Sequence, residues 1–253
     1  ISPYRYVGVN FNSQGNPNLK PSDNYNLDLK WDFNPTPTEL ISLTAFYKLI
    51  KNPISRIEVA SAGGYLSYEN IADKATVAGV EIEIRKNLFV RPVSNAAHGM
   101  NKLSLGLNGS YIYTNAKMPL ATVTTGSQLE GAAPWIVNFD LSHNFTKGER
   151  SFVNTLVLNY VSDKIYTIGT QGYQDIMEQG VLTLDFVSQA KLNKHLSLNL
   201  KARNLLNPSY KLSRKANENG EKVILNDYKK GINISLGVSC TCLLYKSPSP
   251  RDA

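Results

Sequence analysis

The chain has 253 residues, of which 42% are hydrophobic and 19% are charged, and its formal net charge is +7. No apolar run approaches the roughly 20 residues that a transmembrane helix needs, so a helical membrane protein is excluded. The positive charge is diffuse, because no cluster of Lys or Arg is longer than Lys229-Lys230, and nucleic-acid binding is therefore not expected.

The ends of the chain carry little structural signal. Cys240 and Cys242 are too close in an extended strand for an ordinary disulfide and have no further metal ligands nearby, so neither a disulfide framework nor a zinc site is predicted. The chain starts at Ile1 without an initiator Met or a signal peptide and continues as a polar segment rich in Asn and Pro. We therefore expect a piece of a longer protein.

After this segment, apolar and polar residues alternate with a period of two, which predicts β-strands and no amphipathic helix. In the first strand, Leu27, Leu29 and Trp31 alternate with Asp28 and Lys30. The same pattern predicts strands at residues 24–33, 40–51, 75–86, 103–114, 135–145, 151–162, 182–192, 195–203 and 228–241. In 151–162, additional valines leave the orientation of the two faces open.

The hairpin at residues 182–203 shows the alternation most clearly. One face carries leucines and Phe186, and the other carries charged side chains such as Lys191 and Lys201. Asn193-Lys194 is the predicted two-residue turn, which makes the arms antiparallel neighbours. The arms have about the 9–11 residues with which a barrel strand crosses a membrane.

The connectors between the strands alternate between short and long, with residues 87–101 as the one short turn that is longer than expected. This asymmetry is typical of an up-and-down barrel in an outer membrane, whose periplasmic turns are short and whose outer loops are long. The sequence therefore predicts an all-β fold: an antiparallel up-and-down transmembrane β-barrel, present here as a partial barrel of about nine strands.

The distribution of charge supports a membrane barrel. The face with the large apolar residues carries a charge only at Lys230, at a strand end. A Lys or Arg that faces lipid at the midplane costs roughly 2–4 kcal/mol, whereas a wet lumen tolerates it. Aromatic residues also gather near strand ends, as in interfacial girdles. The charges of the opposite face are Asp28, Lys30, Asp32, Lys48, Glu81, Glu83, Arg85, Asp140, Asp185, Lys191, Lys201 and Arg203.

A soluble β-sandwich is the structural alternative, because its strands also alternate, with the apolar face turned inward. Soluble strands average about five or six residues, and nearly all of the predicted strands are about twice as long. A sandwich also gives no reason for the regular succession of short and long connectors.

Four segments carry a family resemblance: GNPNLKPSDNYNLDLKWDF, ATVAGVEIEIRKNL, LEGAAPWIVNFDLSHNF and LNKHLSLNLKARNLLNPSY. From about Gly15 to Ser239 the chain resembles the C-terminal part of the barrel of TonB-dependent outer-membrane receptors. The resemblance implies a barrel of about 22 strands around an N-terminal plug, in the outer membrane of a Gram-negative bacterium. It implies three partners: outer-membrane lipid, a TonB-type energy-coupling complex reached through N-terminal parts outside this chain, and a nutrient ligand at the outer loops.

The sequence departs from the family at its C-terminal end. Members finish with an aromatic residue on the lipid face of the last strand, but here the chain reads CLLYKSPSPRDA from Cys242. That tail resembles the translated read-through of a sequencing adaptor. We expect residues 1–239 to be the C-terminal portion of the barrel and residues 240–253 to be a non-native tail.

No catalytic, metal or cofactor site is predicted. His98, His143 and His195 lack a Ser, a Cys or a carboxylate pair at a useful spacing, so they are interpreted as surface histidines. The carboxylates of Glu81 and Glu83 fit a charged lumen wall better than a catalytic pair. The glycine-rich stretches at 62–64 and 169–172 lack the strand-to-helix setting of a phosphate cradle. We therefore do not expect an enzyme.

Two long loops, at residues 56–68 and 160–173, bring Tyr, Gly and polar residues to the expected outer mouth. Tyrosine rings and polar groups suit the capture of a sugar, peptide or chelate, although ordinary solvated loop residues are the alternative. The predicted function is energy-coupled uptake of a scarce nutrient such as an iron chelate, glycan or peptide. The predicted ligand contacts are Arg56, Tyr65, Tyr68, Tyr166 and Tyr173.

Two other functions are alternatives to import. A barrel that serves structure or adhesion without transport would lack a plug domain upstream. A membrane-barrel hydrolase would need a histidine with a carboxylate at the outer rim, and the sequence shows no such pair.

Overall fold

The computed structural model describes residues 5–6, 11–59, 65–93, 99–118, 128–216 and 220–241. Within these ranges every helix or strand is a β-strand, which confirms the predicted all-β class. In the same ranges, no helix has the length and apolar character needed to span a membrane.

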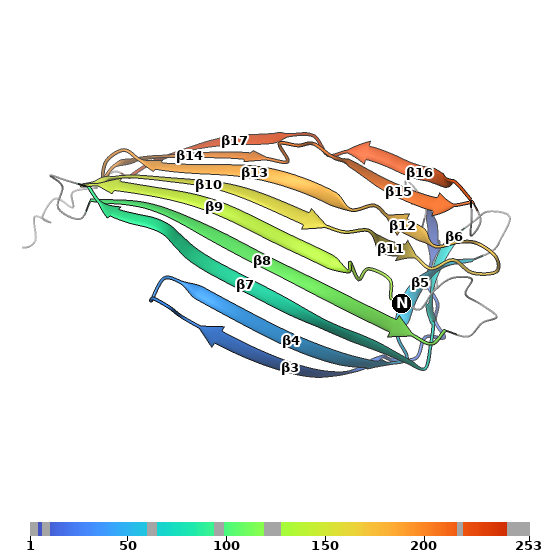
Figure 1. Cartoon of the computed structure of the whole chain (residues 1–253). Coiled ribbons are helices and arrows are strands. Elements are labelled where there is room, and N and C mark those ends of the chain that lie inside the picture. Colours follow the sequence, from blue (N-terminus) through green and yellow to red (C-terminus); the bar gives the residue numbers. More distant parts are fainter. Residues whose placement is uncertain are drawn as a thin grey trace, which may run out of the picture.

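The largest assembly of the described residues is a nine-stranded antiparallel sheet, which confirms the predicted partial barrel (Figure 1). Its order is β17-β14-β13-β10-β9-β8-β7-β4-β3, so each strand pairs with the next membrane-length strand of the chain. The strands are β3 (Asp23–Phe33), β4 (Leu40–Lys51), β7 (Lys74–Pro92), β8 (Met100–Ala116), β9 (Trp135–Lys147), β10 (Arg150–Val161), β13 (Val181–Lys191), β14 (Leu196–Arg203) and β17 (Asn233–Cys240).

The register of the sheet gives it one apolar and one polar face. Leu156 of β10 lies between Leu141 of β9 and Phe186 of β13, so the large apolar residues of neighbouring strands share a face. This settles the orientation of residues 151–162 that the sequence left open. The apolar face is exposed, most of all on the edge strands, where Leu29 is 75% and Leu236 is 72% accessible.

The predicted connector at 87–101 was largely wrong. β7 continues to Pro92, and its register shifts between Asn87 and Phe89, which marks a β-bulge. A bulge reverses the alternation of inward and outward residues, so the pattern of period two stops there although the strand does not. Glu39 in the β3–β4 turn accepts hydrogen bonds from the amide of Asn87 at 3.0 Å and from Lys86 Nζ at 3.1 Å, which holds the bulged segment.

The predicted two-residue turn of the 182–203 hairpin was one residue too short. The amide of Leu192 donates to the carbonyl of Leu196 at 3.0 Å, which leaves residues 193–195 in the loop. Cross-strand partners share a face, so only this register keeps the leucines of both arms together. The Oδ1 of Asn193 accepts hydrogen bonds from the amides of His195 and Leu196 and closes the loop.

The predicted last strand, 228–241, divides into two elements. Residues up to Lys229 belong to β16 (Lys222–Lys229), whereas β17 begins at Asn233. The break is at Gly231, whose φ of 80° lies in the left-handed region that glycine adopts readily. Its amide donates to Asn207 Oδ1 at 3.1 Å and its carbonyl accepts from Asn204 Nδ2 at 2.7 Å, so its hydrogen bonds leave the strand ladder.

The long connectors, expected to be loops, contain further strands. They form two small four-stranded sheets among the described residues, both at the same end of the main sheet (Figure 1). One has the order β1-β2-β6-β5 and the other β11-β12-β15-β16. Their bounds are β1 Arg5–Tyr6, β2 Asn12–Gln14, β5 Ile54–Val59, β6 Tyr65–Asn70, β11 Lys164–Thr167, β12 Ile176–Glu178 and β15 Ser209–Lys215, with β16 given above.

The buried core of the described residues lies at this end of the molecule. The two small sheets are joined by a parallel bridge between Ile57 and Ile168. Residues 128–134 join them as well, because the amide of Gly131 donates to the carbonyl of Ile165 at 2.8 Å. We call this assembly the loop cap. Its core consists of Ile57, Ile71, Ala72, Ala75, Ala116, Leu129, Ile165 and Ile168.

Candidate ligand-binding mouth

All five predicted contact residues belong to the loop cap. Arg56 lies on β5, Tyr65 and Tyr68 lie on β6, Tyr166 lies on β11, and Tyr173 lies in the segment that leads to β12. The cap therefore gathers side chains from two connectors that are about a hundred residues apart in the chain.

Arg56 is the centre of one group. Its backbone pairs with that of Tyr68, and its guanidinium lies over the ring of Tyr166 at 4.2 Å from the ring centroid. Glu130 binds Arg56 at three points: its Oε2 accepts from the amide at 2.5 Å, and its Oε1 accepts from Nε at 3.1 Å and from Nη2 at 2.8 Å. The structure thus brings together three of the five predicted residues around an ion pair.

The electrostatics of this group favour a fixed, fully charged arginine. Burial alone would lower the pKa of Arg56, but the hydrogen bonds and the charge of Glu130 outweigh it, so the pKa is raised above its ordinary value. Because both side chains are mostly buried, the pair is shielded from solvent ions more than a surface pair would be. Arg56 is therefore suited to position the tyrosines around it.

A second ion pair lies beside the first. Glu58, two residues after Arg56 on the same face of β5, pairs with Arg214 of β15. The guanidinium of Arg214 lies 5.3 Å from the centroid of the Tyr173 ring, and Thr170 Oγ1 donates to the Glu58 carbonyl at 2.5 Å. Tyr173 is thus placed by this second pair, and its side chain is the most exposed of the predicted set at 44%.

Tyr65 is not part of either group. It lies at the far end of β6, where its backbone pairs with Val59 on one side and with Asn12 on the other. Its side chain shares a face with Val59 and Ser67 and lies on the face of the hairpin opposite to Arg56. The structure therefore assembles four of the five predicted residues in these two groups and places Tyr65 on the opposite face of the hairpin.

Glu58, Glu130 and Arg214 are missing from the sequence prediction. Glu130 is 74 residues from Arg56, and Arg214 is 156 residues from Glu58. Spacing along a strand cannot reveal such pairs, because they depend on how separate connectors fold together. One available signal was Glu130 in the segment LEGAAP, a lone carboxylate beside small residues.

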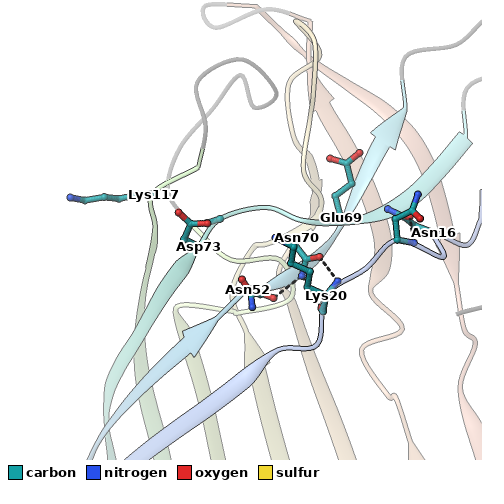
Figure 2. A pocket seen from close by; sticks show the side chains of 9 residues that line it. Asn16, Lys20, Asn52, Glu69, Asn70, Asp73 and Lys117 are labelled. Carbon is teal, nitrogen blue, oxygen red and sulfur yellow. Dashed lines mark hydrogen bonds between the residues drawn. The ribbon is translucent and has the colours of Figure 1, made fainter.

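A polar pocket of about 360 Å³ opens at the Asn70 end of the β5–β6 hairpin (Figure 2). Its wall is built by asparagines: Asn70 accepts from the amide of Lys20 at 2.8 Å and donates to the carbonyl of Asn52 at 2.9 Å. Asn16 Nδ2 donates to the carbonyl of Tyr68 at 2.8 Å, which connects this pocket to the Arg56 group. The lining residues are Asn16, Asn18, Lys20, Asn52, Glu69, Asn70, Ala72, Asp73 and Lys117.

The charged side chains of this pocket are spread around it. Glu69 points away from Asn70 and Lys117 lies beyond Asp73, whereas Lys20 lies beside Asn52 and Asn70 (Figure 2). Asp73 and Lys117 also line an adjoining pocket of about 450 Å³, so the two pockets share part of their lining. The sequence predicted only a loop for the Asn-rich segment before the first strand. It gave no sign that Asn16, Asn18 and Lys20 of this segment line the pocket.

The remaining candidates lie elsewhere. His143 and His195 are on or beside strands of the main sheet, and Glu83 pairs with Arg85 at 2.7 Å on the polar face. His98 and residues 62–64 lie outside the described residues. In the described part of the chain, no group of His, Cys, Asp and Glu side chains is placed to hold a metal ion.

The long antiparallel strands, the single apolar outer face and the cap of folded connectors define a β-barrel of the outer-membrane type. Residues 2–205 match the family model described as "TonB dependent receptor-like, beta-barrel". The match spans well over half of the chain, so the chain belongs to this family, as the sequence resemblance predicted. Members of the family are transport receptors, typically of the Gram-negative outer membrane. No curated protein and no solved structure gives a significant match to the chain.

Proposed function

We propose that this chain is the C-terminal part of a receptor that imports a scarce nutrient, such as an iron chelate, a glycan or a peptide, with energy from a TonB-type complex. Residues 1–239 supply the last strands of the barrel in this proposal, and residues 240–253 are a non-native tail. The coupling complex acts through N-terminal parts beyond this chain.

The observation that carries the proposal is the folding of the connectors into one cap with aromatic and polar side chains. Tyr68, Tyr166 and Tyr173 offer ring faces for stacking and hydroxyl groups for hydrogen bonds. The Arg56–Glu130 and Glu58–Arg214 pairs keep these rings in place before a ligand arrives. Preorganisation of this kind reduces the entropy lost on binding.

The proposed ligand contacts are Arg56, Tyr65, Tyr68, Tyr166 and Tyr173. Tyr173 offers the most accessible ring, and Tyr65 contributes from the opposite face of the hairpin. The adjoining asparagine-lined pocket can receive hydroxyl or carbonyl groups of a ligand too large for the tyrosines alone.

Alanine substitution of all five residues in the complete receptor tests the proposal. Loss of several contacts should raise the half-saturation concentration for uptake by about tenfold or more, since each factor of ten corresponds to about 1.4 kcal/mol. Tyr228→Ala, which removes an exposed tyrosine of the same cap outside the proposed set, is the matched control. If the variant with all five substitutions folds and its uptake affinity is unchanged, these residues do not contact the ligand.

A further inference from the structure

A row of polar side chains crosses the otherwise apolar face of the main sheet, near the end with the short turns. His143 of β9 pairs with Asn154 of β10, and Asn154 pairs with Ser188 of β13. On the neighbouring strands, Asn101 of β8 pairs with Arg91 of β7. We call this row the outward polar strip; its members are Arg91, Asn101, His143, Asn154 and Ser188.

The register places the strip on the apolar face. His143 lies between Leu141 and Phe145 along β9 with one residue in between on each side, and residues spaced by two share a face. Asn154 stands in the same relation to Phe152 and Leu156 of β10, and Leu156 is 38% exposed. The bulge in β7 turns Arg91 to this face as well, because its partner Asn101 alternates with the apolar residues of β8.

The strip is hydrogen-bonded within itself but keeps donors for a ligand. His143 Nε2 donates to Asn101 Oδ1 at 2.9 Å, and Ser188 Oγ donates to Asn154 Oδ1 at 2.7 Å. Both bonds use the amide oxygens, and the amide nitrogens of the two asparagines donate no hydrogen bond within the described residues. In the same ranges no carboxylate pairs with Arg91, whose guanidinium lies 5.4 Å from the centroid of the Phe89 ring.

The strip lies at the periplasmic edge of the apolar band. Asn101 pairs with Phe145, so Asn101 and its partner Arg91 are level with the row of Phe145 and Phe152, while His143 lies one row deeper. Trp135, which packs on Tyr111 with ring centroids 4.6 Å apart, marks the outer aromatic girdle. His143 follows eight residues later, about 21 Å along the membrane normal at a rise of about 3.4 Å per residue and a tilt of about 40°, against an apolar band about 25 Å tall. Phe145 and Phe152, with centroids 6.4 Å apart, form the next row toward the turn and mark the inner girdle.

We propose that the outward polar strip binds the head group of a glycerophospholipid in the periplasmic leaflet of the outer membrane. The guanidinium of Arg91 takes the phosphate, because it is the one cation of the strip and has no carboxylate partner in the described residues. The amide nitrogens of Asn101 and Asn154 donate to the ester carbonyls of the glycerol, and the acyl chains lie along Leu141 and Leu156. This assignment rests on the family's place in the outer membrane and is independent of the nutrient.

The complete receptor, purified in detergent and freed of lipid, should be titrated with phosphatidylglycerol, and the bound lipid counted by native mass spectrometry. The unmodified receptor is expected to retain the lipid, and an R91A/N154L/S188L variant to bind it about tenfold or more weakly. Lys102→Ala removes a cation from the opposite, polar face of β8 at the same end of the barrel and serves as the matched control, with affinity unchanged.

Three further measurements test the assignment. Diacylglycerol, which keeps the ester carbonyls but lacks the phosphate, should bind equally well to the unmodified receptor and to Arg91→Ala. Inorganic phosphate should not displace the phospholipid. If the triple variant fails to fold, as judged by heat-dependent gel mobility, Arg91→Ala alone carries the test because its side chain is exposed. The assignment would be overturned if the receptor and the triple variant bound the lipid equally well, or if Lys102→Ala weakened binding as much as the triple variant. It would also be overturned if the substitutions disrupted a receptor dimer that holds no lipid.

Discussion

At the scale of single residues, the loop cap depends on a few charged side chains that join connectors distant in sequence. Arg56 and Glu130 are the clearest case, since three hydrogen bonds link them and both are mostly buried. Removing one partner of a buried charged pair leaves the other without compensation, which costs more than the pair itself contributes. The tyrosines around Arg56 should therefore respond to changes at Glu130.

Glu130→Gln removes the charge that Arg56 faces and keeps the size of the side chain. The loss of charged hydrogen bonds should destabilise the cap by about 1–3 kcal/mol. Hydrogen exchange at the amide of Arg56, which donates to Glu130, should accelerate accordingly. Glu69→Gln is the control, because this exposed glutamate lies on the same hairpin. Equal exchange in both variants would contradict the role of the Arg56–Glu130 pair.

Glu39 gives a prediction with a defined pH dependence. The amide of Asn87 and the ammonium of Lys86 stabilise its carboxylate and lower its pKa below the ordinary value. A carboxylate with a lowered folded-state pKa contributes stability above its unfolded pKa of about 4.3, and this contribution is lost as pH falls through the folded-state pKa. The folded barrel should lose part of its thermal stability on acidification below that range, and Glu39→Gln should lose less. If the thermal stability of the unmodified barrel and of Glu39→Gln falls by the same amount on acidification, Glu39 does not hold the bulge.

At the scale of elements, close packing on the polar face of the sheet fixes where glycine is required. Gly79 of β7 lies under the ring of Phe46, and a Cβ there would also approach the carbonyl oxygen of Tyr111 to 2.5 Å. The ring can turn, but the backbone oxygen belongs to the strand ladder and cannot move freely. Gly109 of β8 differs, since the nearest atom to an added Cβ is Ile82 Cγ2 at 3.7 Å.

Gly79→Ala should therefore destabilise the barrel by about 1–3 kcal/mol, while Gly109→Ala should have little effect or a small stabilising one. The two substitutions add the same methyl group to adjacent strands, so each controls for the other. The thermal midpoint of the transition from the compact to the extended gel form distinguishes them. If both substitutions change the thermal midpoint by a similar amount, the neighbours of Gly79 accommodate the added methyl group without a loss of stability.

The elements also show what the sequence could predict. Alternation was sufficient for the strands of the main sheet, because one face contacts lipid and the other water along their whole length. It failed where local geometry interrupts the period: at the bulge after Lys86, in the turn closed by Asn193 and at Gly231. The short strands of the loop cap escaped detection because they span as few as two residues and are set by contacts between connectors.

The candidate site, like the fold, was predicted only in part. Tyrosine and arginine in two long connectors indicated a polar mouth, and the structure assembles Arg56, Tyr68, Tyr166 and Tyr173 there. The positions of Glu58, Glu130 and Arg214 could not be predicted, since they depend on the tertiary fold of the cap. The asparagine-lined pocket was missed for the same reason.

At the scale of the whole molecule, the nine-stranded sheet is open within the described residues. Within the described residues β3 and β17 are its edges and do not pair with each other, and an open edge in lipid leaves backbone groups without hydrogen bonds. In the proposed receptor the remaining strands close the barrel and a plug fills it. The cap then covers the outer entrance, and the polar face of the sheet lines the space around the plug.

If this barrel imports its ligand with energy from a TonB-type complex, accumulation of the ligand depends on the coupling protein. The most direct measurement is the accumulation of the nutrient that the complete receptor binds, in cells with and without the coupling protein. Accumulation should fall to background without the coupling protein, while binding at the cell surface stays unchanged. Equal accumulation in both strains, or binding with no accumulation in either, would contradict the account and favour a passive or adhesive barrel.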